Sequence, residues 1–122
     1  MQALENAQPS PASPQTAGSL HGRACNFIET NCHRPIGIRD VATSLGVTRR
    51  TLERHFQNFA QVTPAFHLQR TRLERARRLL CQTDLPIKAI SYTCGFGSPQ
   101  RMIYDFRKVW QMTPGQVRDE SH

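Results

Sequence analysis

Lysine is scarce in this sequence of 122 residues, although the chain is strongly basic. Of the 16 basic residues, 14 are arginine, and only Lys88 and Lys108 are lysine. Arginine presents a planar fork of donors that suits bidentate contacts with phosphate and with guanine. Residues 48–108 hold 12 basic against 4 acidic residues (+8), and the remainder holds 4 against 5 (−1). This distribution favours a polyanionic partner, without distinguishing DNA from RNA or an anionic membrane.

Closely spaced cysteines and long apolar runs are both absent. Cys25, Cys32, Cys81 and Cys94 form no C-x-x-C pair, and no histidine lies at zinc-ligand spacing from them. No apolar stretch approaches the roughly 20 residues that a membrane helix requires, and no segment resembles a signal peptide. We therefore expect reduced thiols, no metal and no cofactor, and a cytoplasmic, nucleoid-associated protein.

Patterns typical of catalysis are missing as well. The length argues against a multi-domain enzyme, and the five histidines show no spacing that indicates catalysis. A thiol enzyme built on Cys81 or Cys94 is an alternative. It is disfavoured because Cys94 falls at a predicted core position, and buried cysteines are mostly inert packing residues. We expect no enzymatic activity.

Segments that alternate apolar and polar residues are lacking too, so the chain is predicted to be all-α with about seven helices. Residues 1–19 are rich in proline, alanine and amides and are predicted to be a disordered arm or linker. Helical spacing begins at Leu20 and breaks at Pro35. A short second helix closes at Gly46, and Thr48 can cap a third. The buried stripe of that third helix is predicted to be Leu52, Phe56 and Phe59.

Cap residues followed by proline mark three further helix starts. They are Thr63-Pro64, Ser98-Pro99 and Thr113-Pro114. The first of these helices can run to about Gln82, which gives it a length of roughly 28 Å. It carries five arginines, of which we expect about half to pair along the helix or to cover the core.

The chain nearly repeats itself at a period of about 50 residues, which is the most informative feature of the sequence. Apolar positions and caps of the first copy recur in order in the second, with one extra residue in the turn. The first copy comprises Ile38, Val41, Leu45, Gly46, Thr48, Leu52, Phe56, Phe59, Gln61 and Thr63-Pro64. The second comprises Ile87, Ile90, Cys94, Gly95, Ser98, Met102, Phe106, Val109, Gln111 and Thr113-Pro114.

Within the first copy, Ala42, Gly46 and Leu52 have the spacing of a helix-turn-helix. An ordinary αα-hairpin has the same requirements, but the duplication and the concentrated charge favour the helix-turn-helix. The expected domain is a double helix-turn-helix over residues 20–118. It divides into a first unit (20–62), a linker helix (63–83) and a second unit (84–118), and residues 119–122 form a tail.

One face of each second helix carries side chains suited to contacts with DNA. In the first unit they are Thr48, Arg49, Arg50, Thr51, Glu53, Arg54 and Gln57. In the second they are Ser98, Gln100, Arg101, Ile103, Tyr104, Arg107 and Lys108. A solvated polar face is the alternative. It explains the arginines but explains an exposed Ile103 poorly, and this residue could contact a thymine methyl group.

These residues together resemble the DNA-binding domain of the AraC/XylS family of bacterial transcription regulators. The similarity covers about residues 20–118. Its specific segments are Pro35-Ile36, Asp40-Val41-Ala42, Leu45-Gly46-Val47, residues 48–54, Phe56, Thr63-Pro64, Leu68, Arg72-Leu73, Ala76-Arg77, Leu79-Leu80, Gly95-Phe96, Ser98, Phe106-Arg107 and Thr113-Pro114. Departures include Met102 and Tyr104 in the second reading helix, Gln61 and Gln111 in place of turn glycines, and His67 and Val117 in place of aromatic residues.

The resemblance implies a monomeric domain that reads two adjacent major grooves of an asymmetric promoter site, with DNA bending and contact with RNA polymerase. The expected role is that of an activator. Most members carry a separate sensor or dimerisation domain, so the chain is interpreted as a C-terminal fragment or a minimal stand-alone member. The alternative function is a basic helical module that binds an acidic protein without sequence-specific DNA binding.

Overall fold

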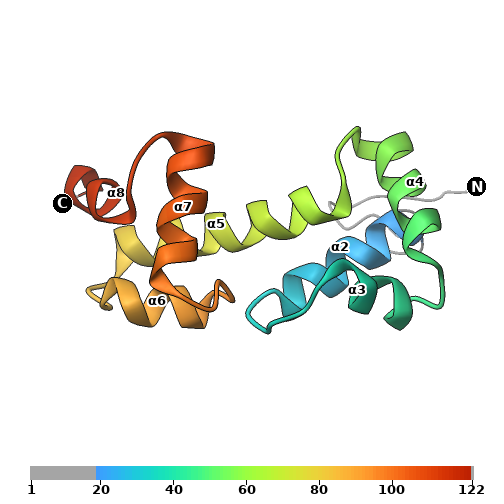
Figure 1. Cartoon of the computed structure of the whole chain (residues 1–122), viewed down its shortest axis with the longest axis horizontal. Coiled ribbons are helices and arrows are strands. Elements are labelled where there is room, and N and C mark those ends of the chain that lie inside the picture. The colour runs from blue at the N-terminus through green and yellow to red at the C-terminus, as the bar shows by residue number, and fades with distance from the viewer. Residues whose placement is uncertain (1–18, 122) are drawn as a thin grey trace, which may run out of the picture. The chain divides into compact units, whose positions relative to one another are not determined.

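The computed structural model describes residues 19–121, so the predicted disordered arm lies, apart from Ser19, outside the described residues. The described part is all-α and contains seven helices and no strand (Figure 1), as the sequence predicted. The helices are α2 (Leu20–Asn31), α3 (Ile38–Ser44), α4 (Arg49–Ala60), α5 (Pro64–Gln82), α6 (Ile87–Thr93), α7 (Pro99–Trp110) and α8 (Pro114–Ser121).

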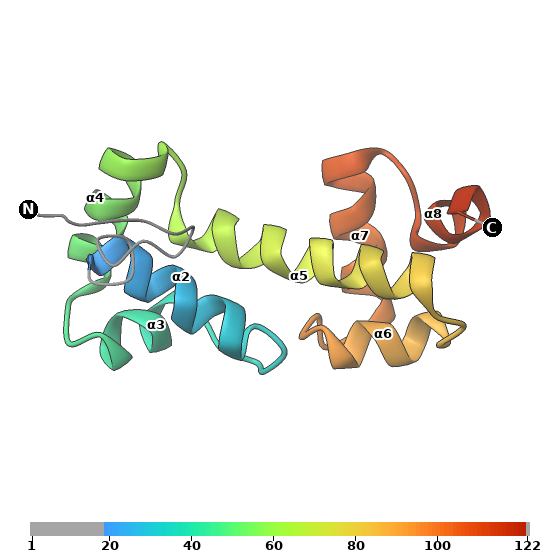
Figure 2. The same cartoon turned by 180° about the vertical axis from the view of Figure 1, so that it is seen from behind.

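The described residues form two compact units. The first contains residues 19–30 together with 37–67, and its buried core is drawn from α2, α3 and α4, with Phe56, Leu52 and Ile28 as its largest members. The second contains residues 31–36 and 68–121. Its core gathers side chains from α5, α6, α7 and α8, among them Leu73, Leu80, Ile90, Met102 and Phe106. Seen from behind, α7 passes behind α5 and its lower end lies over α6 within this unit (Figure 2).

The internal repeat is visible in the positions of the helices. α7 begins and ends 50 residues after α4, and α8 begins 50 residues after α5. The caps follow the same offset: the Thr48 and Ser98 side chains cap the N-termini of α4 and α7, and Gln61 and Gln111 end them in the left-handed conformation at φ 55° and 56°. The repeat predicted from the sequence is therefore a structural repeat.

The predicted cap-proline starts are all confirmed. The Thr63 hydroxyl accepts a hydrogen bond of 3.0 Å from the Phe66 N–H at the start of α5. The Thr113 hydroxyl accepts one of 3.1 Å from the Gln116 N–H at the start of α8, and the Gln116 side chain accepts one of 2.8 Å from the Thr113 N–H in return. Such side-chain acceptors satisfy N–H groups that have no partner within the helix. α8 continues to Ser121, so the expected boundary at residue 118 lies inside a helix.

Several arginines of α5 have structural partners, as expected from the sequence. Glu74 accepts hydrogen bonds from Arg70 (3.0 Å) and Arg77 (2.8 Å) on the same helix. The guanidinium groups of these two arginines also lie 5.3 and 5.1 Å from the ring centre of Trp110 on α7. These arginines therefore help to attach α7 to α5 within the second unit.

The prediction that Phe59 is buried is wrong. Its side chain is 62% exposed, whereas Leu52 and Phe56 are fully buried. Phe59 lies in the last turn of α4, at the edge of the apolar stripe, where its ring stacks with His21 at 5.7 Å and with His55 at 6.4 Å. The hydrophobic period alone could not distinguish this stacked surface position from a core position.

Candidate nucleic-acid interface

Two of the predicted contact residues of the first unit form the N-terminal cap of α4. The Thr48 hydroxyl accepts a hydrogen bond of 3.1 Å from the Thr51 N–H and donates one of 3.0 Å to the Thr51 hydroxyl. A cap of this kind fixes where the helix begins and thus which residues face outward in its first turns. Thr48 and Thr51 therefore position the α4 face, whatever else they contact.

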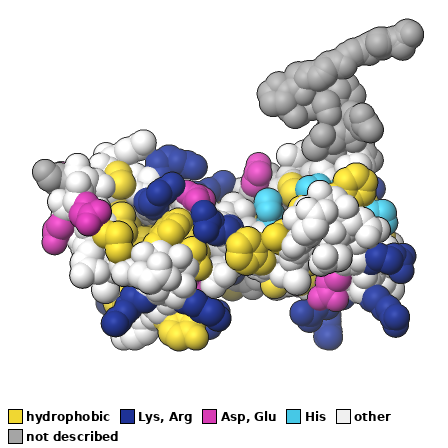
Figure 3. Space-filling model, turned by 90° about the horizontal axis from the view of Figure 1, so that it is seen from above, with side chains coloured by type: hydrophobic (Ala, Val, Ile, Leu, Met, Phe, Trp, Pro, Cys, Tyr) yellow, Lys and Arg dark blue, Asp and Glu magenta, His cyan; other side chains and the backbone are white. Residues whose placement is uncertain are grey.

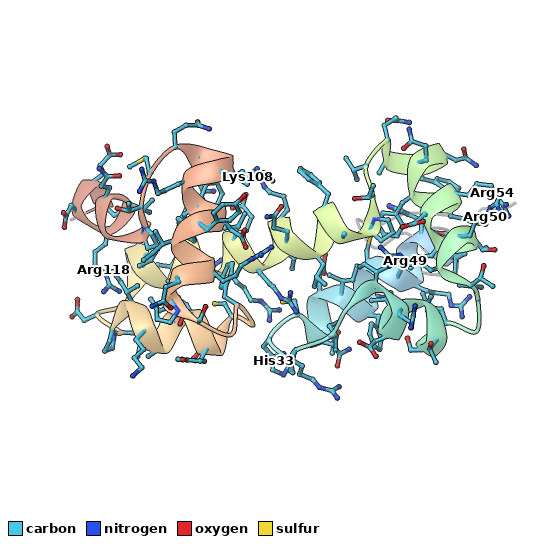
Figure 4. The ribbon with its side chains drawn as sticks, in the orientation of Figure 1. His33, Arg49, Arg50, Arg54, Lys108 and Arg118 are labelled. Carbon is cyan, nitrogen blue, oxygen red and sulfur yellow. The ribbon has the colours of Figure 1, made fainter. Side chains whose placement is uncertain are left out.

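The outward face of α4 presents Arg50, Arg54 and Gln57, all exposed. Arg50 and Arg54 project from the same side of the helix (Figure 4), as expected for residues four positions apart. Within residues 19–121 neither guanidinium has a hydrogen-bond or ion-pair partner. Arg49 differs, because its Nε lies 3.1 Å from the Glu53 carboxylate. Arg50 and Arg54 are thus the two guanidinium groups of α4 that have no partner within the described residues.

The outward face of α7 is built around a shallow hollow. It has a volume of about 590 Å³ and is lined by Gln100, Ile103, Tyr104, Arg107 and Lys108, all of them predicted contact residues. In the space-filling view, yellow apolar side chains lie between dark-blue basic ones on the second unit (Figure 3). The Ser98 hydroxyl caps this helix by accepting a hydrogen bond of 3.1 Å from the Arg101 N–H. Seven predicted residues of the second unit therefore either line this face or set its register.

Arg101 is held by its own helix. Its Nε lies 3.2 Å from Oδ2 of Asp105, and the Asp105 carboxylate is only 3% exposed. The Arg101 guanidinium also lies 5.8 Å from the ring centre of Tyr104. Removing the arginine would leave a buried carboxylate without this charge partner, which is costly. A structural role therefore accounts for the position of Arg101.

Tyr104 is the most exposed apolar ring on this face, at 57%. Two cations flank it: Arg101, and Lys108 with Nζ 5.9 Å from the ring centre. Such contacts restrict the ring while leaving its hydroxyl accessible. The face of α7 thus combines an apolar and aromatic surface with cations in its last turn.

Sequence reasoning missed the role of Asp105. It occupies the position that His55 holds in the first copy, and only the i,i+4 spacing to Arg101 could have indicated the pair. Asp105 also lies near enough to Arg72 of α5 to influence its guanidinium electrostatically. The acidic side chain is therefore part of the internal structure of the second unit.

Two of the cysteines, Cys25 and Cys94, have thiols that ionise less readily than usual. Burial raises the pKa of the Cys94 thiol to about 11, and burial together with Glu29 raises that of Cys25 to about 11. The reactive thiolate is scarce at neutral pH for such groups. Cys94 is fully buried in the second core, where its role is packing.

The described residues contain neither a cluster of metal ligands nor a helix suited to a membrane. No group of three histidine, cysteine, aspartate or glutamate side chains there could hold a metal ion. Among residues 19–121, no helix is both long and apolar enough to cross a bilayer.

Comparison with known proteins places these features in a family. A family described as "Helix-turn-helix domain" matches residues 41–120. The "HTH-type transcriptional regulator CdhR" of Pseudomonas aeruginosa is 36% identical over 91 residues, which cover 75% of this chain and 27% of that protein. The "Xylose operon regulatory protein" of Escherichia coli K12 is 32% identical over 97 residues, which cover 80% of this chain and 25% of that protein. The chain thus spans about a quarter of the length of these relatives.

A solved structure from Chromobacterium violaceum is similar as well. It is a transcriptional regulator described as having an AraC-type DNA-binding domain, and it is 35% identical to this chain with a TM-score of 0.73. The match covers 80% of this chain and 88% of that one. Because the family match alone extends over residues 41–120, well over half of the sequence, the chain belongs to the AraC/XylS family of helix-turn-helix domains.

Proposed function

We propose that this chain is a sequence-specific DNA-binding domain of a transcription regulator, with α4 and α7 as its two recognition helices. The observation that carries the proposal is the repeated, capped helix whose outward face presents side chains suited to DNA. In α4 these are the available guanidinium groups of Arg50 and Arg54. The relatives that share up to 36% identity with the chain are named as transcriptional regulators, which supports the same role here.

The chemistry of the two faces suits duplex DNA. A recognition helix enters the major groove with side chains near its N-terminal half reaching base edges. Arg50 and Arg54 lie in the first two turns of α4, and Gln100, Ile103 and Tyr104 lie in the corresponding turns of α7. Arg107 and Lys108 lie in the last turn of α7 and are placed to contact phosphates, which fix register without reading sequence.

The wider role follows from family membership. We infer that the chain acts at promoters, reads two adjacent major grooves of an asymmetric site as a monomeric domain, and activates transcription through contact with RNA polymerase. The division into a first unit (20–62), a linker helix (63–83) and a second unit (84–118) is part of this proposal. A sensor or dimerisation domain on the same or another chain would supply the regulatory signal.

The experiment is selection of bound duplexes from a random DNA pool, followed by measurement of the dissociation constant (Kd) for the selected and a scrambled duplex. The proposal predicts an enriched site and tighter binding to it. Failure to enrich any site, or an equal Kd for the selected and the scrambled duplex, would support the alternative of a basic module for acidic proteins. The double variant Arg50→Ala/Arg54→Ala is the matched control, because it removes two exposed side chains without disturbing the core.

A further inference from the structure

The outward faces of α4 and α7 differ in chemistry at equivalent positions. With the offset of 50 residues, Arg50 corresponds to Gln100 and Arg54 corresponds to Tyr104. All four side chains are exposed, and both helices are capped by a hydroxyl at the preceding residue. The two helices therefore present different groups in the same register to whatever they bind.

On α4, the equivalent positions carry guanidinium groups without partners among the described residues. Guanine offers two acceptors, O6 and N7, in the major groove, and a guanidinium can contact both at once. The pair Arg50 and Arg54 is thus suited to guanine.

On α7, the one guanidinium of the first two turns is held by its own helix, in contrast to the guanidinium groups of Arg50 and Arg54. Arg101, the arginine of this stretch, is bound at 3.2 Å to the buried carboxylate of Asp105 and lies beside the Tyr104 ring. In these turns the hollow is lined by the exposed side chain of Gln100, the half-buried side chain of Ile103 and the ring of Tyr104, which lies between Arg101 and Lys108. Gln100 and Ile103 are the two that no cation contacts.

These two side chains match an adenine-thymine pair. A glutamine amide can donate to adenine N7 and accept from adenine N6, and an apolar side chain can contact the thymine C5-methyl group. We infer that the DNA under α7 is selected for A·T pairs, with Gln100 facing adenine and Ile103 facing a thymine methyl, whereas α4 selects guanine. Gln100 and Ile103 are then the specificity-determining residues of the second unit. The inference rests on the proposed DNA-binding function.

The test begins from the site selected out of a random pool. The block that loses its preference in Gln100→Ala is assigned to α7, and the block that loses it in Arg54→Ala is assigned to α4. We expect A·T pairs in the first block and guanine in the second. Gln100→Arg should shift one position of the α7 block from adenine to guanine.

A chemical substitution in the DNA then tests the methyl contact alone. Replacing each thymine of the α7 block in turn by deoxyuridine removes one methyl group and nothing else. For one thymine we expect a weakening of about fourfold in the wild-type protein, the value of one buried methyl group. The same replacement should leave the Kd of Ile103→Ala unchanged, and Lys108→Ala, matched as a neighbouring variant, should keep the wild-type sensitivity.

Circular dichroism and the melting temperature test whether Ile103→Ala is folded. If Ile103→Ala does not fold, Ile103→Val serves as a second, milder variant. In that variant the sensitivity to deoxyuridine should be kept, because a branched apolar side chain remains. A guanine-rich α7 block, or a wild-type protein indifferent to deoxyuridine at every thymine of that block, would overturn the inference and leave the proposed function standing. Failure of the pool to enrich any site would instead defeat the proposed function itself.

Discussion

Arg72 Nε donates a hydrogen bond of 2.8 Å to the carbonyl oxygen of Cys32, forty positions earlier in the chain. Its Nη2 donates to the carbonyl oxygens of Arg34 (2.8 Å) and Ile36 (3.3 Å). One guanidinium of α5 thus satisfies three carbonyl groups of the loop after α2. Burial lowers the pKa of Arg72 below its ordinary value, yet an arginine keeps its charge at neutral pH.

Replacing Arg72 should therefore destabilise the second unit. We expect Arg72→Met to lower the free energy of unfolding by about 2 to 3 kcal/mol, because three carbonyl groups, two of them partly buried, lose a charged donor. Arg72→Lys should recover only part of the loss, since an ammonium cannot reproduce the planar fork. Urea unfolding followed by circular dichroism measures the change. Arg78→Met, an exposed position on the same helix, is the control, and an equal loss in both variants would contradict this role of Arg72.

The two turn glycines should differ in their tolerance of a side chain. Gly95 has φ +88°, and a Cβ atom there would overlap the Cys32 carbonyl oxygen, a backbone atom that cannot rotate away. Gly46 has φ +73° but nothing within 4 Å of the Cβ position. We expect Gly95→Ala to cost about 2 to 4 kcal/mol, combining overlap and left-handed strain, and Gly46→Ala about 1 kcal/mol from strain alone. Thermal unfolding of the two variants measures the difference. Similar melting temperatures would show that the loop containing Cys32 can move enough to accommodate the added side chain.

These two sites show what the sequence could and could not reveal. The turn glycines, the helix caps and the order of the helices follow from local chemistry. The sequence pattern around Thr48, Ser98 and the prolines after the cap residues therefore predicted them correctly. The closeness of Gly95 to Cys32 and the bonds from Arg72 depend on segments far apart in the chain. No local pattern could indicate them.

The candidate site also has features that the sequence could predict and features that it could not. Helical periodicity predicted correctly that Arg50, Arg54, Gln100 and Tyr104 face outward. It could not predict that Arg101 is bound to a buried carboxylate, because burial of Asp105 depends on how the second core packs around it. The DNA contacts themselves remain predictions.

His67 should make the stability of the first unit depend on pH. Burial lowers the pKa of His67 below its ordinary 6.5, opposed by Glu29 and aided by His21, and its ring lies edge-on to Phe56 at 5.8 Å. The unfolded chain therefore takes up the proton at a higher pH than the folded chain. Stability is fully present above about pH 6.5 and decreases as the pH falls below it.

His67→Phe should remove this dependence, because phenylalanine keeps the ring and cannot bind a proton. The measurement is the urea midpoint at about pH 7.5 and about pH 5.5, on either side of the ordinary histidine value. The wild type should lose stability between the two, and His67→Phe should lose less. His33→Gln, at an exposed loop position, should behave as the wild type. If His67→Phe loses as much stability between the two pH values as the wild type does, another group is responsible for the pH dependence.

The two recognition helices should contribute unequally to specificity. Arg54→Ala should cost about 1 to 3 kcal/mol of binding free energy and relax the preference at one or two positions, because a bidentate guanine contact is lost. Tyr104→Ala should cost less, since tyrosine offers one hydroxyl and an apolar ring. Binding of each variant to a panel of singly substituted sites measures both effects. A larger loss of specificity from Tyr104→Ala would reverse the ranking of the helices.

The dependence of binding on salt tests sequence-specific DNA binding most directly, when it is measured for the selected and the scrambled duplex in parallel. Residues 48–108 carry a net charge of +8, from 12 basic and 4 acidic residues. If about six phosphates are neutralised, log K should fall against log salt with a slope near −5. The selected duplex should remain at least about a thousandfold tighter than the scrambled one. A slope shallower than about −2, with equal affinity for both duplexes, would contradict the account.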